Sequence, residues 1–466
     1  MVSLSNHSSF VALTFYALRF IHMTVSLSFK YYQPRKLEII DTTLREGSQT
    51  SLLHDHYKYF FTTADKIEIV RALILYGVKF IELFAPNVSP QEAADFAAIK
   101  AARDELVVQC GYTFLLAHVR CHPADVEAAI NAGADGLNMY MGTSEVSRNY
   151  NHGQGLGEII QRSMQLIEEV HRNYPDLILR FSGEDAFRTH EEDLFSVYDG
   201  IAGCVSRFGT PDTVGVATPG AVARRIQLLR ERYPHVDLEG HFHDDRGFTL
   251  VNALEAVHAG VRYINTTLLG IGERSGITSM TALLFNLFVD KQYDYLDGYH
   301  LRGSYPINVL MADKLRKLVP SKEPVSLTNR THAAGVHQKA MINSASTYEA
   351  NPLDQFGITE SEILLGPLSG WNVIHYFLKE ICGFDIDENT AKAITASFKQ
   401  QVYNIPFGES PSALLINVAE HEFGLKLMNV PEQFRGMIEQ NLTETSRTNE
   451  IGEVTHASGV ILRSKR

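Results

Sequence analysis

The sequence predicts an α/β fold in which eight parallel strands close into a barrel, followed by small, mostly helical subdomains. From Lys36 onwards, short apolar runs of β character alternate with amphipathic segments of helical spacing. These β/α units fill about 250 residues, which is the usual size of a (β/α)8 TIM barrel. Ionisable side chains also recur where the candidate strands end, and barrel enzymes carry their active sites at that end of the strands.

The individual elements follow from apolar periodicity and from residues typical of helix ends. The strand candidates are 36–40, 79–84, 113–118, 136–141, 177–182, 213–217, 236–243 and 262–268. Helical segments include 65–76, 90–106, 123–132, 155–173, 219–232 and 248–259. Capping residues or prolines begin several of them, as at Asp65 and Pro90, and Gly77 and Gly133 end others. An open doubly wound sheet is the alternative, but it usually has fewer strands, and no GxGxxG follows the first strand.

Composition limits the classes of function. The 466 residues are 45% hydrophobic and 21% charged, which is ordinary for a globular protein larger than one small domain. A net charge of −12 argues against nucleic-acid and membrane-surface partners, although a local basic pocket remains possible. The four cysteines lie far apart without a CxxC pair, so we expect no disulfide framework and a reducing compartment, the cytoplasm.

The chain divides into four regions. Residues 1–35 contain no Asp or Glu, and their apolar run Phe10–Leu18 is too short to span a bilayer. We interpret this region as a disordered extension or the result of an upstream start, with an organelle-targeting segment as the alternative. Residues 36–295 form the predicted barrel and 296–404 the helical subdomains. No function is assigned to the C-terminal extension, 405–466.

The stretch GHFHDD (240–245) predicts a metal site. Side chains two residues apart on a strand point to the same face, so His241 and His243 project side by side at a strand end. Paired imidazoles with carboxylates next in line suit a divalent cation. Such a pair also occurs by chance on exposed strands, and the other strand ends decide between the two interpretations.

Those other strand ends also carry polar side chains. In chain order they are Arg45-Glu46, Arg120-Cys121-His122, Arg180 with Ser182 and Glu184, Thr218, and the loop LLGIGERSG (268–276). Because all eight strands of a barrel end at the same rim, we expect these side chains to surround one site.

Several motifs resemble those of the metal-dependent acyl-CoA condensing enzymes of the homocitrate and isopropylmalate synthase superfamily. They are DTTLREG (41–47), GHFHDD (240–245) and NTTLLGIGERSGIT (265–278). RCHPADVEAAINAGADGLNMYMGTS (120–144), YNHG (150–153) and RFSGEDAFRT (180–189) narrow the resemblance to the homocitrate synthase family, and HAAGVHQKAMINSASTYE (332–349) matches its segment beyond the barrel. The similarity covers roughly residues 36–400.

The resemblance implies a metal site and a way of activating the first substrate. Glu46, His241 and His243 would bind one divalent cation, either Zn²⁺, Mg²⁺ or Mn²⁺, with positions left open for substrate. A 2-oxo acid would chelate this metal through its ketone and C1 carboxylate. Arg45 would stabilise the alkoxide that develops from the ketone; a structural salt bridge to a neighbouring strand is the alternative for this residue.

The resemblance also implies where a proton leaves the methyl group of the co-substrate, acetyl-CoA. His337 and Tyr348 would come from the partner subunit, which predicts a homodimer with shared active sites. Glu184 corresponds to a strand-five carboxylate that takes part in the same proton transfers. His122 is expected to orient substrate, and His332 is expected to be a surface histidine.

Substrate choice depends on strand five. Arg180 with Ser182 and Thr218 fits a second carboxylate, since a guanidinium fork matches that group. Leu269 stands where isopropylmalate synthases have Asn, which again favours homocitrate synthesis from 2-oxoglutarate, a step of lysine biosynthesis. Ser48 departs from the family pattern, and leaves oxaloacetate or a longer diacid open.

Three other functions remain as alternatives. An isopropylmalate- or citramalate-type synthase would use another 2-oxo acid. A lyase of the same barrel superfamily would cleave rather than join, but the catalytic Cys in the loop of hydroxymethylglutaryl-CoA lyases is missing from LLGIGERSG. A non-catalytic binding protein would not need Glu46, His241 and His243 together.

Overall fold

A computed structural model describes residues 35–55, 57–406, 409–426 and 459–463. The chain divides into two compact units, Met1–Lys317 and Leu318–Arg466, and each is described by itself. The predicted N-terminal extension and most of the C-terminal one lie outside the described residues. Within the described part of the chain, no helix combines the length and the apolar character needed to cross a membrane.

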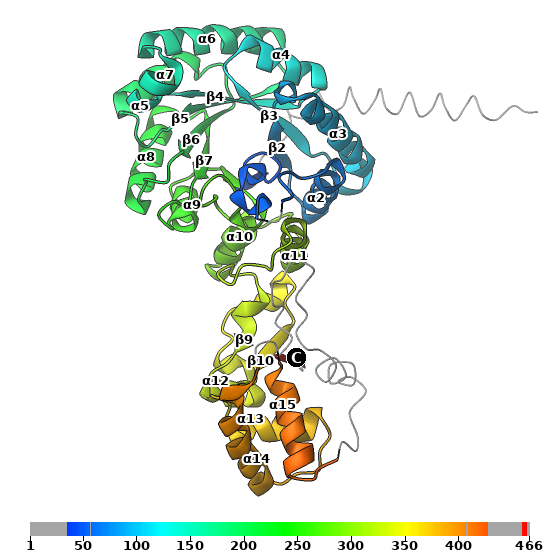
Figure 1. Ribbon diagram of the computed structural model, residues 1–466. Helices are drawn as coiled ribbons and strands as arrows, with labels where there is room; N and C mark the ends of the chain where they lie inside the picture. The colour runs from blue at the N-terminus through cyan, green and yellow to red at the C-terminus, as the bar shows by residue number, and fades with distance from the viewer. Residues whose placement is uncertain (1–34, 56, 407–408, 427–458, 464–466) are drawn as a thin grey trace, which may run out of the picture. The chain divides into compact units, whose positions relative to one another are not determined.

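The first unit is a closed barrel of parallel strands, β1 to β8 in chain order (Figure 1). The strands are β1 (Glu38–Asp41), β2 (Phe80–Phe84), β3 (Phe114–Arg120), β4 (Gly136–Gly142), β5 (Ile178–Glu184), β6 (Arg207–Asp212), β7 (Asp237–Phe242) and β8 (Tyr263–Thr266). The last strand pairs with the first, with Asn265 opposite Ile40, so the ring has no open edge. This confirms the predicted (β/α)8 barrel.

Helices follow the strands and cover the outside of the ring (Figure 1). They are α2 (Thr63–Tyr76), α3 (Pro90–Cys110), α4 (Pro123–Ala132), α5 (Glu145–Ser147), α6 (Leu156–Asn173), α7 (Glu191–Ile201), α8 (Pro219–Arg232), α9 (Thr249–His258), α10 (Met280–Val289) and α11 (Ser304–Leu315). Local chemistry explains their ends. Thr62 and Asp65 form a capping box at the start of α2, and Gly77 ends it with a φ of 103°.

Strand six differs from the prediction. The segment 213–217, TVGVA, is a loop, and the strand is β6, Arg207–Asp212. Its sequence, RFGTPD, contains a Gly and a Pro that strands usually avoid, whereas TVGVA has the β-branched residues that strands favour. The consequence is functional, because the rim end of strand six lies several residues earlier in the chain than predicted.

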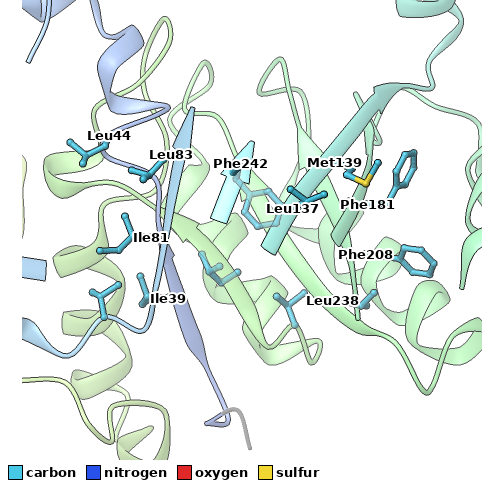
Figure 2. Packing of buried hydrophobic residues seen from close by; sticks show 14 of the residues in the cluster. Ile39, Leu44, Ile81, Leu83, Leu137, Met139, Phe181, Phe208, Leu238 and Phe242 are labelled. Carbon is cyan, nitrogen blue, oxygen red and sulfur yellow. The ribbon is translucent and has the colours of Figure 1, made fainter. Parts of the chain in front are cut away.

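The outward face of the strands makes the main hydrophobic core. Figure 2 shows Ile39, Ile81, Leu137, Phe181 and Leu238 among these residues. All five are buried with apolar residues of the surrounding helices, such as Ile69 of α2 and Ile167 of α6. The outward residues occupy alternate strand positions, as the period of a strand requires.

The inward face of the strands changes character along the barrel axis. One layer is apolar and contains Ile40, Phe80, Phe114, Leu116, Ile178 and Tyr263. Further along several strands the inward side chains become charged, with Glu82 two residues after Phe80 on β2, Arg180 two residues after Ile178 on β5, and Glu239 on β7. The next inward positions reach the rim where the candidate site was predicted.

The second unit is small and mostly helical, as predicted. Its elements are β9 (Thr331–His332), α12 (Gly335–Asn343), β10 (Glu360–Leu364), α13 (Trp371–Tyr376), α14 (Glu388–Gln401), α15 (Pro411–Asn417) and β11 (Gly459–Arg463). The strand β10 pairs in parallel with β9 and antiparallel with β11. Phe377, Ile394 and Leu415 belong to a separate buried cluster, so α15, after residue 404, is part of this core.

Candidate active site

A cavity of about 290 Å³ opens at the C-terminal rim of the barrel strands. It is lined by Arg45, Glu46, Gln49, His118, Tyr140, Arg180, Ser182, Glu184, Pro211, Thr213, His241, His243, Glu273 and Arg274. Nine residues of the predicted strand ends are among them: Arg45, Glu46, Arg180, Ser182, Glu184, His241, His243, and Glu273 and Arg274 of the loop 268–276. The closed barrel brings these distant parts of the sequence together.

Glu46, His241 and His243 form a candidate metal site. One ligand atom of each lies within 4.8 Å of the others, and all three residues are buried. The Nε2 atoms of the two imidazoles are 3.3 Å apart, and Nε2 of His243 is 3.9 Å from Oε1 of Glu46. Two imidazoles and a carboxylate without a thiolate suit Zn²⁺, Mg²⁺ or Mn²⁺, so the donors fit a divalent cation.

Neighbouring groups orient these three side chains. Nδ1 of His241 donates to the amide oxygen of Asn265 at 3.1 Å, which leaves Nε2 without a hydrogen and able to bind a metal. The backbone N–H of Glu273 donates to Oε1 of Glu46 at 2.9 Å. A Cβ at Gly272 would lie 3.1 Å from that same carboxylate, so glycine gives the loop its close approach.

The charge states of the three side chains also suit a metal. Burial alone would raise the pKa of Glu46, but Arg45 and the two histidines hold it at about 2. Burial, together with His243, lowers the pKa of His241 to about 3. The site therefore offers an ionised carboxylate and a neutral imidazole at neutral pH, which are the protonation states that metal ligands need.

Arg45 forms the structural salt bridge considered for it and also lines the cavity. Its Nε donates to Oε1 of Glu82 on the neighbouring strand β2 at 2.9 Å, and its Nη1 donates to Glu46. The structural salt bridge is therefore present, and the guanidinium also lines the cavity next to the candidate metal ligands. The two acceptors hold Arg45 in one orientation, and the positive charge of Arg45 keeps Glu46 ionised.

Arg180 and Ser182 of β5 also line the cavity. Nε and Nη2 of Arg180 both donate to Glu239, so two of its three nitrogens already have a carboxylate partner. The hydroxyl of Ser182 is buried and has no hydrogen-bond partner among the described residues. A Cβ on Gly209 of β6 would lie 1.9 Å from that hydroxyl, so Gly209 makes the space that Ser182 occupies.

Glu184 stands at the end of β5 in the cavity wall. Burial raises the pKa of its carboxyl, the adjacent Asp185 raises it further, and Arg45 opposes the shift. A carboxyl group with a raised pKa exchanges protons more readily near neutral pH than an ordinary glutamate.

Two predicted substrate ligands lie outside the cavity. His122 is the N-cap of α4, where its Nδ1 accepts from the N–H of Ala124. Thr218 caps α8 by accepting from Ala221. The resemblance implied His122, and Thr218 was assigned from the predicted end of strand six; both are exposed helix caps.

Neighbours of these two residues line the cavity instead. On β3, the residue that lines the cavity is His118, whose ring stacks on that of Tyr140 with centroids 4.4 Å apart. After β6 it is Thr213, whose hydroxyl accepts from the N–H of Asp185 at 2.9 Å. Alternation within the predicted strands could have found His118 and Tyr140, since both fall on the inward positions. Thr213 was missed because strand six was predicted at 213–217, whereas it ends at Asp212 and Thr213 directly follows it.

The structure places His337 and Tyr348 in the second unit. Their rings stack with centroids 3.8 Å apart, and both side chains are exposed. His332 was expected at the surface, and this prediction was wrong. It is 8% exposed, and its Nε2 lies 3.2 Å from Oε1 of the buried Glu349.

Comparison with known proteins shows which class of protein the barrel belongs to. The family model described as HMGL-like matches residues 36–303. A solved hydroxymethylglutaryl-CoA lyase from Pseudomonas aeruginosa has the same fold, with a TM-score of 0.51, 21% identity, and coverage of 62% of this chain and 96% of that chain. The chain is an HMGL-like barrel protein.

The second unit and the full-length relatives narrow the class. A model described as homocitrate synthase post-HMGL domain-like matches residues 325–404. The mitochondrial homocitrate synthase of Yarrowia lipolytica is 35% identical over 370 residues, 78% of each chain. That of Schizosaccharomyces pombe is 36% identical, covering 78% of this chain and 83% of its own. A 2-isopropylmalate synthase of Microcystis aeruginosa is 28% identical, covering 79% of this chain and 70% of its own. The chain belongs to the homocitrate synthase family.

Replacing His243 with Ala should remove metal binding without unfolding the barrel. The change deletes one of three ligands at the rim, outside the hydrophobic core. We expect the purified variant to lose its bound divalent metal in elemental analysis, with an unchanged circular dichroism spectrum. His235→Ala, an exposed histidine before β7, is the matched control and should keep the metal. Full metal occupancy in the His243 variant would contradict the assignment.

Proposed function

We propose that this protein condenses acetyl-CoA with 2-oxoglutarate to give homocitrate and CoA. The observation that carries the proposal is one cavity lined both by the candidate metal site and by Arg180 with Ser182, whose hydroxyl has no hydrogen-bond partner among the described residues. Such a cavity suits a 2-oxo acid with a second carboxylate. Membership of the homocitrate synthase family supports the same reaction.

The metal would be held by Glu46, His241 and His243. When bound, a divalent cation supplies Lewis-acid chemistry that polarises a ketone. Arg45 contributes a fixed positive charge beside this position, and its two carboxylate partners prevent it from rotating away. Preorganised charge of this kind stabilises negative charge that develops on the ketone oxygen as the new carbon–carbon bond forms.

The second carboxylate of the substrate would bind between Ser182, Thr213 and Arg180. The hydroxyl of Ser182 would gain the hydrogen bond that it lacks in the described structure. Thr213 already accepts from Asp185, so its own hydroxyl hydrogen is available to a carboxylate. Arg180 supplies positive charge, and Glu239 fixes its position.

Replacing Ser182 with Ala should reduce activity on 2-oxoglutarate selectively. A hydrogen bond to a charged group contributes about 1.5–3 kcal/mol, which corresponds to roughly 10- to 150-fold in kcat/KM. Activity on 2-oxoisovalerate, which has no second carboxylate, should change much less. The control is Ser206→Ala. Ser206 directly precedes β6, and its hydroxyl donates to the carbonyl of Leu179, so this change should leave the ratio of the two kcat/KM values as in the wild type. Equal loss on both substrates would contradict the subsite.

Glu184 is proposed to accept a proton during the reaction. Its carboxyl lies in the cavity wall, and burial raises its pKa towards the range useful for proton transfer. The active form of a base is the carboxylate, so activity should rise with pH as Glu184 loses its proton. The acid limb of the kcat profile should therefore lie above the ordinary range of a glutamate.

Replacing Asp185 with Asn tests this assignment through the acid limb. Asp185 raises the pKa of Glu184, so removing its charge should lower that pKa and move the acid limb to lower pH. Asn tolerates the φ of 63° at this position. The control is Asp193→Asn, a partly buried carboxylate that pairs with Arg148. If the acid limb of the kcat profile of Asp185→Asn stays in place or moves to higher pH, Glu184 is not the base.

His337 and Tyr348 of a partner subunit are proposed to take part in removing a proton from the methyl group of acetyl-CoA. Both residues are exposed and stacked in the second unit, and they lie in or beside α12 of the segment that the homocitrate synthase model matches. A homodimer with two shared sites follows from this proposal. Each site would then combine the barrel of one chain with the second unit of the other.

Mixing two inactive variants should restore activity if sites are shared. A hybrid of an Arg45→Ala chain and a His337→Ala chain would contain one site with both residues intact. A hybrid of Arg45→Ala with Glu184→Ala has its two defects in barrels, so it should remain inactive and serves as the control. Turnover should be measured on purified hybrid dimers. An inactive first hybrid would indicate that each site is built within one chain.

The proposed compartment is the cytoplasm. All four cysteines are unpaired, and Cys121 and Cys382 are buried, which is consistent with reducing conditions. The relatives include a protein named a cytosolic isozyme as well as mitochondrial ones.

A further inference from the structure

A buried polar pair in the second unit, His332 and Glu349, adjoins His337 and Tyr348. Nε2 of His332 is 3.2 Å from Oε1 of Glu349, and the hydroxyl of Ser361 donates to the same oxygen at 2.5 Å. The guanidinium of Arg330, which is 2% exposed, approaches the other carboxylate oxygen at 3.5 Å. Because a carboxylate only accepts hydrogen bonds, the imidazole of His332 is the donor in the pair.

Each of the two exposed residues is the direct neighbour of a buried polar anchor. Tyr348 precedes Glu349, which is bonded to His332 on β9 and Ser361 on β10. His337 precedes Gln338, which is fully buried and donates to the carbonyls of His332 and Leu364. His332 therefore holds both segments, one through its ring and one through its backbone.

The start of α12 is fixed as well. A Cβ on Gly335 would lie 2.2 Å from the carbonyl oxygen of Leu368, so the backbone approaches there more closely than any side chain would permit. The ring of His332 also lies edge-on to that of His337, with centroids 6.5 Å apart. The helix that carries His337 is thus held at its first turn, through a glycine, a glutamine and the ring of His332.

We propose that His332 and Glu349 form a positioning pair that sets the stacked geometry of His337 and Tyr348. A buried ion-paired cluster contributes little to stability compared with apolar packing of the same volume, but it fixes one arrangement of its neighbours. The proposal rests on the proposed function, in which His337 and Tyr348 act on acetyl-CoA. His332 and Glu349 are buried and adjoin these two residues, so their effect on the reaction is indirect.

The test compares kcat with KM in four variants of the full-length protein. His332→Ala and Glu349→Ala should lower kcat by about 10- to 100-fold, because small displacements of reacting groups have effects of this size. The KM for 2-oxoglutarate should stay within about 2-fold, since substrate-binding residues are untouched. His332→Gln places an amide N–H near the position of Nε2, and should recover most of kcat. Glu362→Gln, a buried carboxylate on β10 bonded to Thr331, is the control and should behave like the wild type.

The double variant His332→Ala/Glu349→Ala decides whether the two residues act together. We expect its kcat to equal that of either single variant, since each already breaks the pair. Additive losses, or no recovery with Gln, would overturn the proposal. His337→Ala distinguishes this outcome from failure of the proposed function. If His337→Ala keeps full turnover, the function assigned to His337 is wrong; if it is inactive while the His332 and Glu349 variants are active, only the positioning pair is wrong.

Discussion

The interior of the barrel depends on a balanced set of buried charges. Three arginines and three glutamates lie together there: Arg45, Arg180, Arg207, Glu46, Glu82 and Glu239. Moving an isolated charge out of water costs several kcal/mol, so such a layer persists only when each charge meets its opposite. The sequence provides this pairing from separate strands, and no single strand could form it alone.

The contacts of this layer close into a ring. From Glu46 they run through Arg45, Glu82, Asn138, Arg207, Glu239, Arg180 and Asn265 to His241, which returns to the candidate metal site. Two candidate metal ligands and the arginine of the proposed carboxylate subsite therefore belong to one network. Buried hydrogen bonds and the Arg207–Glu239 ion pair fix their relative positions before any ligand arrives, which is the arrangement that electrostatic catalysis requires.

Alternation and strand order explain why much of this could be predicted. The barrel, the paired His241 and His243, and the residues of β5 follow from periodicity and from the rule that barrel strands end at one rim, whereas Glu46 as the third ligand was implied by the family resemblance. The pairing of Arg180 with Glu239 could not be predicted, because it depends on which inward side chains share a layer. His122, which the resemblance implied, and Thr218, which the misplaced end of strand six suggested, lie outside the cavity, whereas His118 and Thr213 line it. His332 was misplaced because its partner Glu349 is distant in sequence.

Three residues of the loops at the rim have a strained backbone. Asp185, Leu269 and Arg274 all have φ values near 60°, which residues other than glycine adopt at a cost. Asp185 follows Glu184 and is held by Ser144, while Arg274 lines the cavity and pairs with Asp245. Leu269 has no polar group to satisfy and packs against the barrel core instead. The ring of buried charges and the hydrophobic core hold these turns in place. The strained loops therefore present their side chains in fixed positions because the barrel supports them.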